Sequence, residues 1–327
     1  MINYEKLKSV CDIFQNKDDF VIITHDNLDG DAISSSLAVF CILKKLNKKC
    51  VIAYESKIPQ NFNFLIDDYF LKEKPYVLFD CEEFDIKDKY VVSVDLADKK
   101  LLGKFLQNIE KIDLCIDHHR TNKIFAEISS LVNPLAASTT EIIYEIAKFL
   151  KLIDIQIAEY IYVGIITDTG RFAYPNVTEK THKIASDLIK IGVRNDTLNY
   201  KIFDCITKNQ IFLNQLVLQT LEFFLNSKCA MIFINQSMLS KSNTSKEDIG
   251  LFTQIPRQIK GVLVGATIKE EKKNVYKVSI RTKVGVSAED ICKKFGGGGH
   301  KNAAGFTVKG DLNQIKQNLL CEISAVL

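Results

Sequence analysis

Four short apolar runs near the start of the chain constrain its fold more than any other feature. They are FVIIT, KCVIAY, YVVSVD and KIDLCID, at residues 20–24, 49–54, 90–95 and 111–117. The runs are rich in Val and Ile, do not alternate with polar residues, and are separated by longer amphipathic segments. Strands of this kind are buried on both faces, as in a parallel sheet that helices cover. We therefore predict an α/β fold with an N-terminal parallel sheet and helices on both of its faces.

The character of the sequence changes near residue 205. Helical periodicity dominates from TTEIIYEIAKFLKL to KNQIFLNQLVLQTLEFFLN, and strand-like runs such as CAMIFIN and VYKVSIRT follow. A chain of 327 residues also exceeds the usual size of one domain. We expect a larger domain over residues 1–205, a linker helix over 206–226 and a smaller α/β domain over 227–327.

The charge balance limits what the protein can bind. The chain has 43 Lys and Arg against 40 Asp and Glu, which gives a net charge of +3. This is not the strong basic excess of a protein that wraps long nucleic acid. We expect any polyanion that it binds to be small or held locally.

The N-terminus and the cysteines indicate a soluble, cytoplasmic protein. The sequence MINYEKLKSVCDIF does not resemble an export signal, and no apolar run approaches the length of a membrane span. The nine cysteines are scattered without a C-x-x-C pair. This distribution favours buried thiols in a reducing compartment over a disulfide framework or a zinc site.

Acidic residues and a histidine crowd the segment directly after the first apolar run. In THDNLDGDAISSSLAVF, His25, Asp26, Asp29 and Asp31 precede a stretch that is typical of a helix. In open α/β sheets, functional groups collect in loops beyond the carboxyl ends of the strands. The alternative is that Asp29 or Asp31 only caps the helix, but a cap requires one carboxylate.

The same pattern recurs at three later positions. Asp95 ends an apolar run, Asp117 with His118 and His119 ends the next, and Asp168 follows another. A single aspartate at such a place is more often a turn residue, but the repetition favours a metal site. Asp and His together suit Mn²⁺ or a similar divalent ion. The ligands are too many for one ion, which predicts two ions that share a carboxylate and activate water.

A glycine run marks the C-terminal domain. In FGGGGHKNAAGF, Gly297, Gly298 and Gly299 precede His300. Backbone without side chains can approach a phosphate closely, although a flexible turn is the alternative reading. Arg281 lies on a predicted strand beside this run and either binds a phosphate or is a solvated edge residue. The segment NPLAASTTE, before a helix at Thr139, is either polar lining of the site or an N-cap.

These motifs together resemble the DHH phosphoesterase superfamily. THDNLDGDAISS, VVSVDLAD, CIDHHRTN and GIITDTGRF are similar to its four N-terminal motifs, and RTKVGVSAEDICKKFGGGGHKNAAGF is similar to the GGGH signature of its DHHA1 domain. The chain is most similar to the short cytoplasmic branch that combines oligoribonuclease (nanoRNase) and 3′-phosphoadenosine 5′-phosphate (pAp) phosphatase activities. The resemblance implies a catalytic, metal-binding DHH domain and a substrate-binding DHHA1 domain.

The resemblance also implies roles for individual residues. One Mn²⁺ would be held by His25, Asp29 and Asp95, and the second by Asp31, Asp95, His118 and Asp168. Asp95 would be the bridging ligand, and His119 would be the catalytic residue that faces the scissile phosphate. Asp117 would orient the histidines, and Asp26 and Asp98 match no ligand position. The residues expected to bind the far phosphate of the substrate are Arg281, Gly297, Gly298, Gly299 and His300.

The implied activity is manganese-dependent hydrolysis of short phosphoesters. Substrates would be short RNA, linear dinucleotides such as pApA and pGpG, and pAp, with nucleoside 5′-monophosphates as products. The resemblance implies no membrane partner and is compatible with a homodimer. A nucleotide-sensing binding module and a pyrophosphatase or polyphosphatase are the two alternatives.

Overall fold

A computed structural model of the chain describes most of its residues as two compact units. The described residues are 3–67, 69, 75–78, 86–104, 109–124, 126, 128–245, 249, 252, 254–283 and 285–327, and the side chain of His300 lies outside this description. Unit 1 is Met1–Asp204 and unit 2 is Cys205–Leu327. Each unit has its own sheet and its own hydrophobic core.

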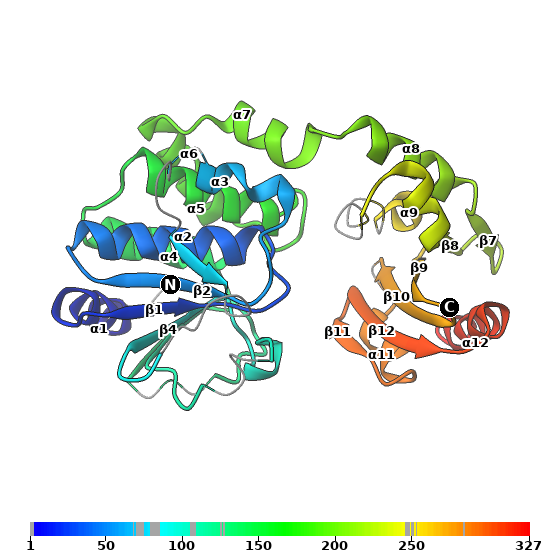
Figure 1. The fold of residues 1–327 in the computed structure, drawn as a ribbon, viewed down its shortest axis with the longest axis horizontal. Helices are drawn as coiled ribbons and strands as arrows, with labels where there is room; N and C mark the ends of the chain where they lie inside the picture. The colour runs from blue at the N-terminus through cyan, green and yellow to red at the C-terminus, as the bar shows by residue number, and fades with distance from the viewer. Residues whose placement is uncertain are drawn as a thin grey trace. The chain divides into compact units, whose positions relative to one another are not determined.

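Unit 1 is built on a six-stranded parallel sheet (Figure 1). Its strands are β1 (Phe20–Ile23), β2 (Cys50–Tyr54), β3 (Tyr76–Leu78), β4 (Tyr90–Val94), β5 (Leu114–Asp117) and β6 (Ser129–Val132). Their order is β3-β2-β1-β4-β5-β6, so the direction in which strands are added reverses between β1 and β4. All four predicted strands are present, and the parallel-sheet α/β class is confirmed.

Burial on both faces explains why the strand sequences do not alternate. In β1, Phe20 and Ile22 join one apolar cluster, and Val21 and Ile23 join another on the opposite face. All four side chains are fully buried. Both faces of the strand therefore require apolar residues.

Helices cover one face of the sheet. In Figure 1, α2, α4 and α5 are stacked over this face, and residues from these helices and from α1 form the larger apolar cluster with the strands. The helices of unit 1 are α1 (Tyr4–Asn16), α2 (Gly30–Lys45), α3 (Phe64–Asp67), α4 (Thr139–Phe149), α5 (Ile155–Asp168), α6 (Glu179–Ile191), α7 (Asn195–Asn199), the 3-10 helices η1 (Gln60–Phe62) and η2 (Lys99–Leu101), and the π-helix η4 (Tyr200–Asp204).

The long helices predicted for the opposite face are not seen among the residues that the structure describes. In the part of the chain that the structure describes, this face is covered by apolar side chains from the connections on either side of β5, including Leu96, Leu102, Ile112 and Ile124. Among the described residues of these connections, the helix that is present is the 3-10 helix η2.

Unit 2 has a mixed six-stranded sheet in the order β11-β12-β10-β9-β8-β7. Its strands are β7 (Glu222–Phe224), β8 (Cys229–Ile234), β9 (Val264–Lys272), β10 (Val275–Thr282), β11 (Gly298–His300) and β12 (Ala303–Lys309). Its helices are α8 (Lys208–Leu218), α9 (Gln236–Ser242), α10 (Ile255–Gln258), α11 (Ala288–Lys293) and α12 (Leu312–Ser324). Side chains from α11 and α12 cover one face of the sheet, and α8 and α9 pack against β8 in a separate cluster.

The predicted linker helix over 206–226 is wrong in its second half. Helix α8 begins with a capping box between Thr207 and Gln210 but ends at Leu218. Residues 222–224 form β7 instead, because Phe223 pairs with Ala230 in the antiparallel ladder with β8. In this strand, Phe224 packs against the apolar core of the unit 2 sheet. Helix α8 is also part of unit 2 by its contacts.

Two further properties of the described residues concern membrane-spanning helices and the state of the cysteines. Within the described ranges, no helix is both long and apolar enough to cross a membrane. The eight cysteines that the structure describes are all free thiols, and five of them are buried. The expectation of buried thiols is confirmed for these five, whereas Cys50 is half-buried and Cys205 and Cys321 are exposed.

Candidate metal centre

Three neighbouring strands deliver the candidate ligands to one edge of the sheet of unit 1. His25 lies just beyond β1, Asp95 follows β4 directly, and His118 and His119 follow β5. These strands are adjacent in the order β1-β4-β5, beside the point where strand order reverses. Ligand sites in open α/β sheets lie at this position, beyond the carboxyl ends of the strands.

Two helices complete the group from the covered face. Helix α2 brings Asp29 at its N-cap and Asp31 in its first turn, and α5 ends at Asp168. The two helices can pack closely because Gly30 has no Cβ. A Cβ at this position would overlap the side chain of Thr167. A Cβ on Gly164 would likewise overlap the Thr140 side chain and lie 2.5 Å from Asp31 Oδ1. Glycine at both positions lets Asp31 and Asp168 approach each other.

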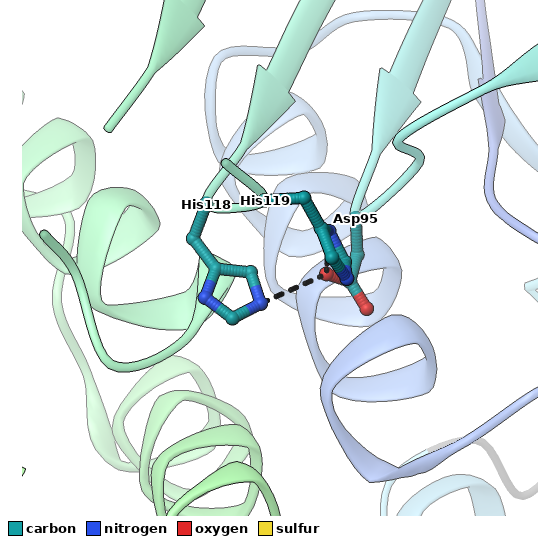
Figure 2. Close-up of side chains that lie close together, drawn as sticks. All are labelled: Asp95, His118 and His119. Carbon is teal, nitrogen blue, oxygen red and sulfur yellow. Dashed lines mark ion pairs between the residues drawn. The ribbon is translucent and has the colours of Figure 1, made fainter. Parts of the chain in front are cut away.

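Asp95 lies at the centre of the arrangement. Its side chain is almost fully buried, and its two oxygens face different partners. Oδ2 is 3.5 Å from His25 Nε2, and Oδ1 is 3.7 Å from His118 Nε2. Figure 2 shows the rings of His118 and His119 around this carboxylate. The single side chain thus contacts both halves of the predicted ligand set.

The backbone of Asp95 adopts an unusual conformation to reach this position. Its φ is +53°, a left-handed value that costs a residue other than glycine about 1–3 kcal/mol. The strain is held because the Asp95 N–H donates a 3.0 Å hydrogen bond to the carbonyl of Ile116 on β5. Such strain is concentrated at functional sites.

Among the residues that the structure describes, three groups of side chains are close enough to hold a divalent ion. They are His25 with Asp29 and Asp95; Asp31 with His118 and Asp168; and Asp95 with His118 and His119. Within each group the potential ligand atoms lie within 4.8 Å of one another. Asp95 and His118 each belong to two groups, so the side chains could hold more than one ion.

The charges of the site fit a cation. Burial and the neighbouring Asp95 carboxylate raise the pKa of Asp31 to about 7. Burial and the carboxylates of Asp31 and Asp95 raise the pKa of Asp168 well above its usual range. Burial also acts to raise the pKa of Asp95, but the imidazoles of His25 and His118 outweigh it and lower that pKa. Crowded carboxylates of this kind are relieved by a bound cation, so the donor set suits a divalent metal.

The orientation of His118 leaves its Nε2 toward the carboxylates. Its Nδ1 lies 3.3 Å from the carbonyl oxygen of Ala136, which can only accept a hydrogen bond. The proton is therefore assigned to Nδ1, and Nε2 is 3.2 Å from Asp168 Oδ2. A metal-binding histidine is normally fixed in this way by a partner on its other ring nitrogen.

His119 is oriented by Asp117 instead. Its Nδ1 lies 2.7 Å from Asp117 Oδ1, which also accepts a 2.8 Å hydrogen bond from the His118 N–H. The other oxygen of Asp117 accepts a hydrogen bond from Asn122 Nδ2. Asp117 is fully buried behind the histidine pair. This contact turns the opposite nitrogen of His119 away from Asp117.

Asp29 combines the two roles that its sequence position suggested. One oxygen caps α2 by accepting a 3.0 Å hydrogen bond from the Ala32 N–H. The other oxygen is 3.8 Å from His25 Nε2. Capping and ligation therefore use different atoms of one side chain and do not exclude each other.

The first two residues of α4 and Asn176 hold several of the candidate ligands by hydrogen bonds that the sequence did not reveal. Thr139 donates to Asp31 through its backbone and to Asp95 through its hydroxyl, and Thr140 N–H also donates to Asp31. Asn176 donates to the carbonyls of Ala137 and Asp168. The sequence marked NPLAASTTE only as a cap or a polar lining, and no pattern marked Asn176 or Asn122.

Unit 2 places two of the predicted phosphate-binding residues, Arg281 and His300, in one row of its sheet. Arg281 on β10 pairs with Ala303 on β12, which pairs with His300 on β11. The side chain of His300 is outside the described part of the structure. Two of the predicted glycines have steric reasons to be glycine, because a Cβ would collide with β12 at both Gly297 and Gly299. Gly298 has open space around it.

Comparison with known proteins now assigns the chain to a family. Residues 19–165 match the DHH family, N-terminal domain, and residues 226–325 match the DHHA1 domain. A Thermus thermophilus protein named bifunctional oligoribonuclease and PAP phosphatase NrnA is 31% identical over 325 residues, 97% of this chain and 93% of that protein. The chain belongs to the DHH family.

Solved structures share the fold of this DHH-family chain. An exopolyphosphatase-related protein from Bacteroides fragilis superposes with a TM-score of 0.90 at 23% identity, covering 99% of this chain and 97% of that one. The exonuclease RecJ bound to manganese superposes with a TM-score of 0.54 at 13% identity, covering 99% and 94%. The DHH match itself contains His25, Asp95 and His118, whereas Asp168 lies just beyond its end.

Proposed function

We propose that this phosphoester hydrolase of the DHH family cleaves short oligoribonucleotides and linear dinucleotides to nucleoside 5′-monophosphates and converts pAp to AMP. The observation that carries the proposal is the shared carboxylate of Asp95, whose two oxygens face His25 on one side and His118 on the other. The name of the Thermus thermophilus relative, an oligoribonuclease and PAP phosphatase, supports the substrate class.

The proposal includes two divalent ions, with Mn²⁺ as the expected metal. His25, Asp29 and Asp95 would hold one ion, and Asp31, Asp95, His118 and Asp168 the other. The manganese bound by RecJ, which shares this fold, supports the choice of metal. When bound, such a pair polarises the phosphoryl group and lowers the pKa of water so that it can attack phosphorus.

His119 would act on the substrate. The Asp117 carboxylate contacts Nδ1 of the His119 ring. Burial and this hydrogen bond are the main influences on the pKa of His119. Burial acts to lower the pKa of His119, but Asp117 and Asp95 outweigh it and raise that pKa above 6.5. A protonated imidazole can stabilise charge on the phosphate and donate a proton to the leaving oxygen.

Unit 2 would bind the terminal phosphate of the substrate. Residues 205–327 contain 17 Lys and Arg against 9 Asp and Glu, whereas residues 1–204 contain 26 against 31. The charge that attracts a polyanion is therefore concentrated in unit 2. Arg281, Gly297, Gly298, Gly299 and His300 are the residues proposed for this contact.

A hydrolysis assay with three substrates tests the proposal. The protein is incubated with Mn²⁺ and either pApA, pAp or pyrophosphate, and the released AMP and orthophosphate are measured. We expect AMP from pApA and pAp, with orthophosphate from pAp. Orthophosphate from pyrophosphate alone would indicate a pyrophosphatase instead, and binding of pApA without hydrolysis would indicate a nucleotide sensor.

Two matched variants show whether the activity belongs to this site. Asp95→Asn should lower turnover by at least about 10³-fold, the scale expected when a shared ligand or an electrostatic stabiliser is lost. Asp98→Asn is the control, because Asp98 caps η2 through the Lys100 N–H and lies in none of the ligand groups. A D95N variant that retains a tenth of wild-type turnover would contradict the shared role of Asp95.

A further inference from the structure

Thr139 contacts two candidate ligands at once. It is the first residue of α4 and is fully buried. Its hydroxyl donates a 2.9 Å hydrogen bond to Asp95 Oδ1, and its backbone N–H donates a 2.6 Å hydrogen bond to Asp31 Oδ2. One residue thus contacts Asp31 of α2 and Asp95, which follows β4.

The hydroxyl is not needed to cap the helix. Ser138 is the N-cap of α4, and its Oγ accepts a hydrogen bond from the Glu141 N–H at 3.3 Å. Thr140 directs its own hydroxyl to Ser138. The helix end is therefore served by Ser138, and the Thr139 hydroxyl has the Asp95 carboxylate as its partner.

The contact fixes how the Asp95 carboxylate is turned. The terminal torsion of an aspartate is broad, so the plane of its carboxylate is set by its partners. The Thr139 hydroxyl binds Oδ1, the oxygen that faces His118, while Oδ2 faces His25. Rotation of the carboxylate would break this division of its two oxygens.

We infer that Thr139 is a positioning residue of the metal centre, and that its hydroxyl holds Asp95 in the orientation in which both ions can share it. The inference rests on the proposed metal pair. Partners of this kind typically change metal affinity or activity by about 10–100-fold when they are removed. Asp31 is held by backbone N–H groups of Thr139 and Thr140, so a side-chain substitution at Thr139 leaves those donors in place.

Substitutions at Thr139 separate the hydroxyl from the packing of the side chain. Thr139→Val has nearly the same shape but lacks the hydroxyl, and Thr139→Ala lacks both the hydroxyl and the methyl group. Thr139→Ser keeps the hydroxyl and loses only the methyl group. If the hydroxyl positions Asp95, Val and Ala should have the same defect and Ser should restore function.

The experiment measures manganese binding as well as activity. Isothermal titration of the metal-free full chain with Mn²⁺ gives the number of ions and their affinities, and thermal unfolding without metal checks the fold. For T139V and T139A we expect at least about tenfold weaker binding of Mn²⁺ and a similar fall in kcat on pApA. The KM should change little, and T139S should remain within about threefold of the wild type.

Each outcome decides a specific statement. Wild-type manganese affinity in T139V and T139A, with their metal-free folds intact, would overturn the role of Thr139. A T139S variant as impaired as T139V would overturn it too, because packing would then be the cause. A wild-type protein that binds no Mn²⁺ would instead overturn the proposed metal centre and the inference with it.

Discussion

At the scale of single residues, the neighbouring His118 and His119 have different hydrogen-bond partners at Nδ1. His118 Nδ1 lies against a backbone carbonyl, and His119 Nδ1 lies against the Asp117 carboxylate. A carboxylate partner favours the protonated imidazole more strongly than a carbonyl does. This difference is the basis for treating His118 as a metal ligand and His119 as the residue that acts on the substrate.

Replacing His119 tests this division of roles. His119→Ala should lower kcat on pApA by about 10²–10⁴-fold, the usual contribution of a general acid, while manganese content stays near two ions per chain. Elemental analysis of the purified variant measures the metal, and a coupled AMP assay measures turnover. Loss of manganese from H119A, with H118A retaining it, would mean that the two roles are exchanged.

Residue identities at the site were predictable where they follow a buried strand. His25, Asp95 and His118 each come just after an apolar run that the sequence displays, so their meeting at one sheet edge follows from the parallel order. Thr139 and Asn176 could not be found in this way. The Thr139 hydroxyl contacts Asp95, and the Asn176 amide contacts two backbone carbonyls. Both contacts depend on tertiary packing and leave no pattern in the sequence.

At the scale of secondary structure, the packing of α2 against α5 determines where Asp31 lies. Gly164 sits in the middle of α5, where alanine would normally stabilise the helix by about 1 kcal/mol. Here a Cβ would overlap Thr140 and crowd Asp31 Oδ1. The glycine therefore lowers the helix propensity of α5 but allows α4 and α2 to approach it closely.

Gly164→Ala should reverse the normal effect of this substitution. Overpacking of a tight contact costs about 1–3 kcal/mol, so we expect a lower free energy of unfolding in spite of the gain in propensity. Displacement of Asp31 should also weaken manganese binding. Urea unfolding of the metal-free chain and titration with Mn²⁺ provide the two measurements. A variant as stable as the wild type, with unchanged manganese affinity, would show that the contact is not restrictive.

A buried ion pair connects the N-terminal half of α5 to Arg194. Glu159 is almost fully buried and accepts hydrogen bonds from Arg194 Nε and Nη2, both at 2.7 Å, and from Tyr69 Oη. Burial acts to raise the pKa of Glu159, but the hydrogen bonds from Arg194 and Tyr69 outweigh it and lower that pKa. The ionised pair thus stabilises the fold at neutral pH, and this stability is lost as pH falls below 4.5 through the lowered pKa.

Arg194→Ala should destabilise the protein in a pH-dependent way. Removing the partner of a buried charge costs about 3–5 kcal/mol, and we expect the lower part of this range because Arg194 is half exposed. The loss should be largest at pH 7 and should shrink as the pH falls below 4.5, because Glu159 is then protonated in the unfolded chain and, at the lowered pKa, in the fold as well. Chemical denaturation of wild type and variant at pH 7 and pH 4 measures the difference.

A surface ion pair offers the matched control. Arg171 and Asp204 form a bidentate contact but are both about half exposed. Arg171→Ala should therefore cost no more than about 1 kcal/mol at either pH. The stabilising role of the buried pair would be contradicted if R194A and R171A lowered the free energy of unfolding equally. It would also be contradicted if the loss in R194A did not depend on pH.

The elements themselves were predictable in proportion to their apolar content. β1, β2, β4 and β5 are continuous apolar runs, and each was predicted. The edge strands β3 and β6 were not, because their residues are mostly half-buried and their sequences therefore do not form a long apolar run. The end of α8 was missed because LEFF continues an apolar pattern that suits either a helix or a strand.

At the scale of the whole molecule, the balanced net charge conceals an uneven distribution. Unit 1 has more acidic than basic residues, and unit 2 has an excess of basic ones. A phosphate chain that continued along unit 1 beyond the metal site would meet a net negative charge. The sequence also contains no tryptophan for stacking against bases. Long single strands normally require a continuous basic track with stacking aromatic side chains.

The dependence of the rate on RNA length tests the proposed substrate class most directly. RNAs of two, three, five, ten and twenty nucleotides, labelled at the 5′ end, are digested with Mn²⁺ under conditions that give kcat/KM for each. We expect kcat/KM to fall at least about tenfold from the dinucleotide to the 20-mer, a difference of about 1.4 kcal/mol in transition-state stabilisation. Degradation of the 20-mer as fast as the dinucleotide would contradict the short-substrate function and would indicate a processive exonuclease.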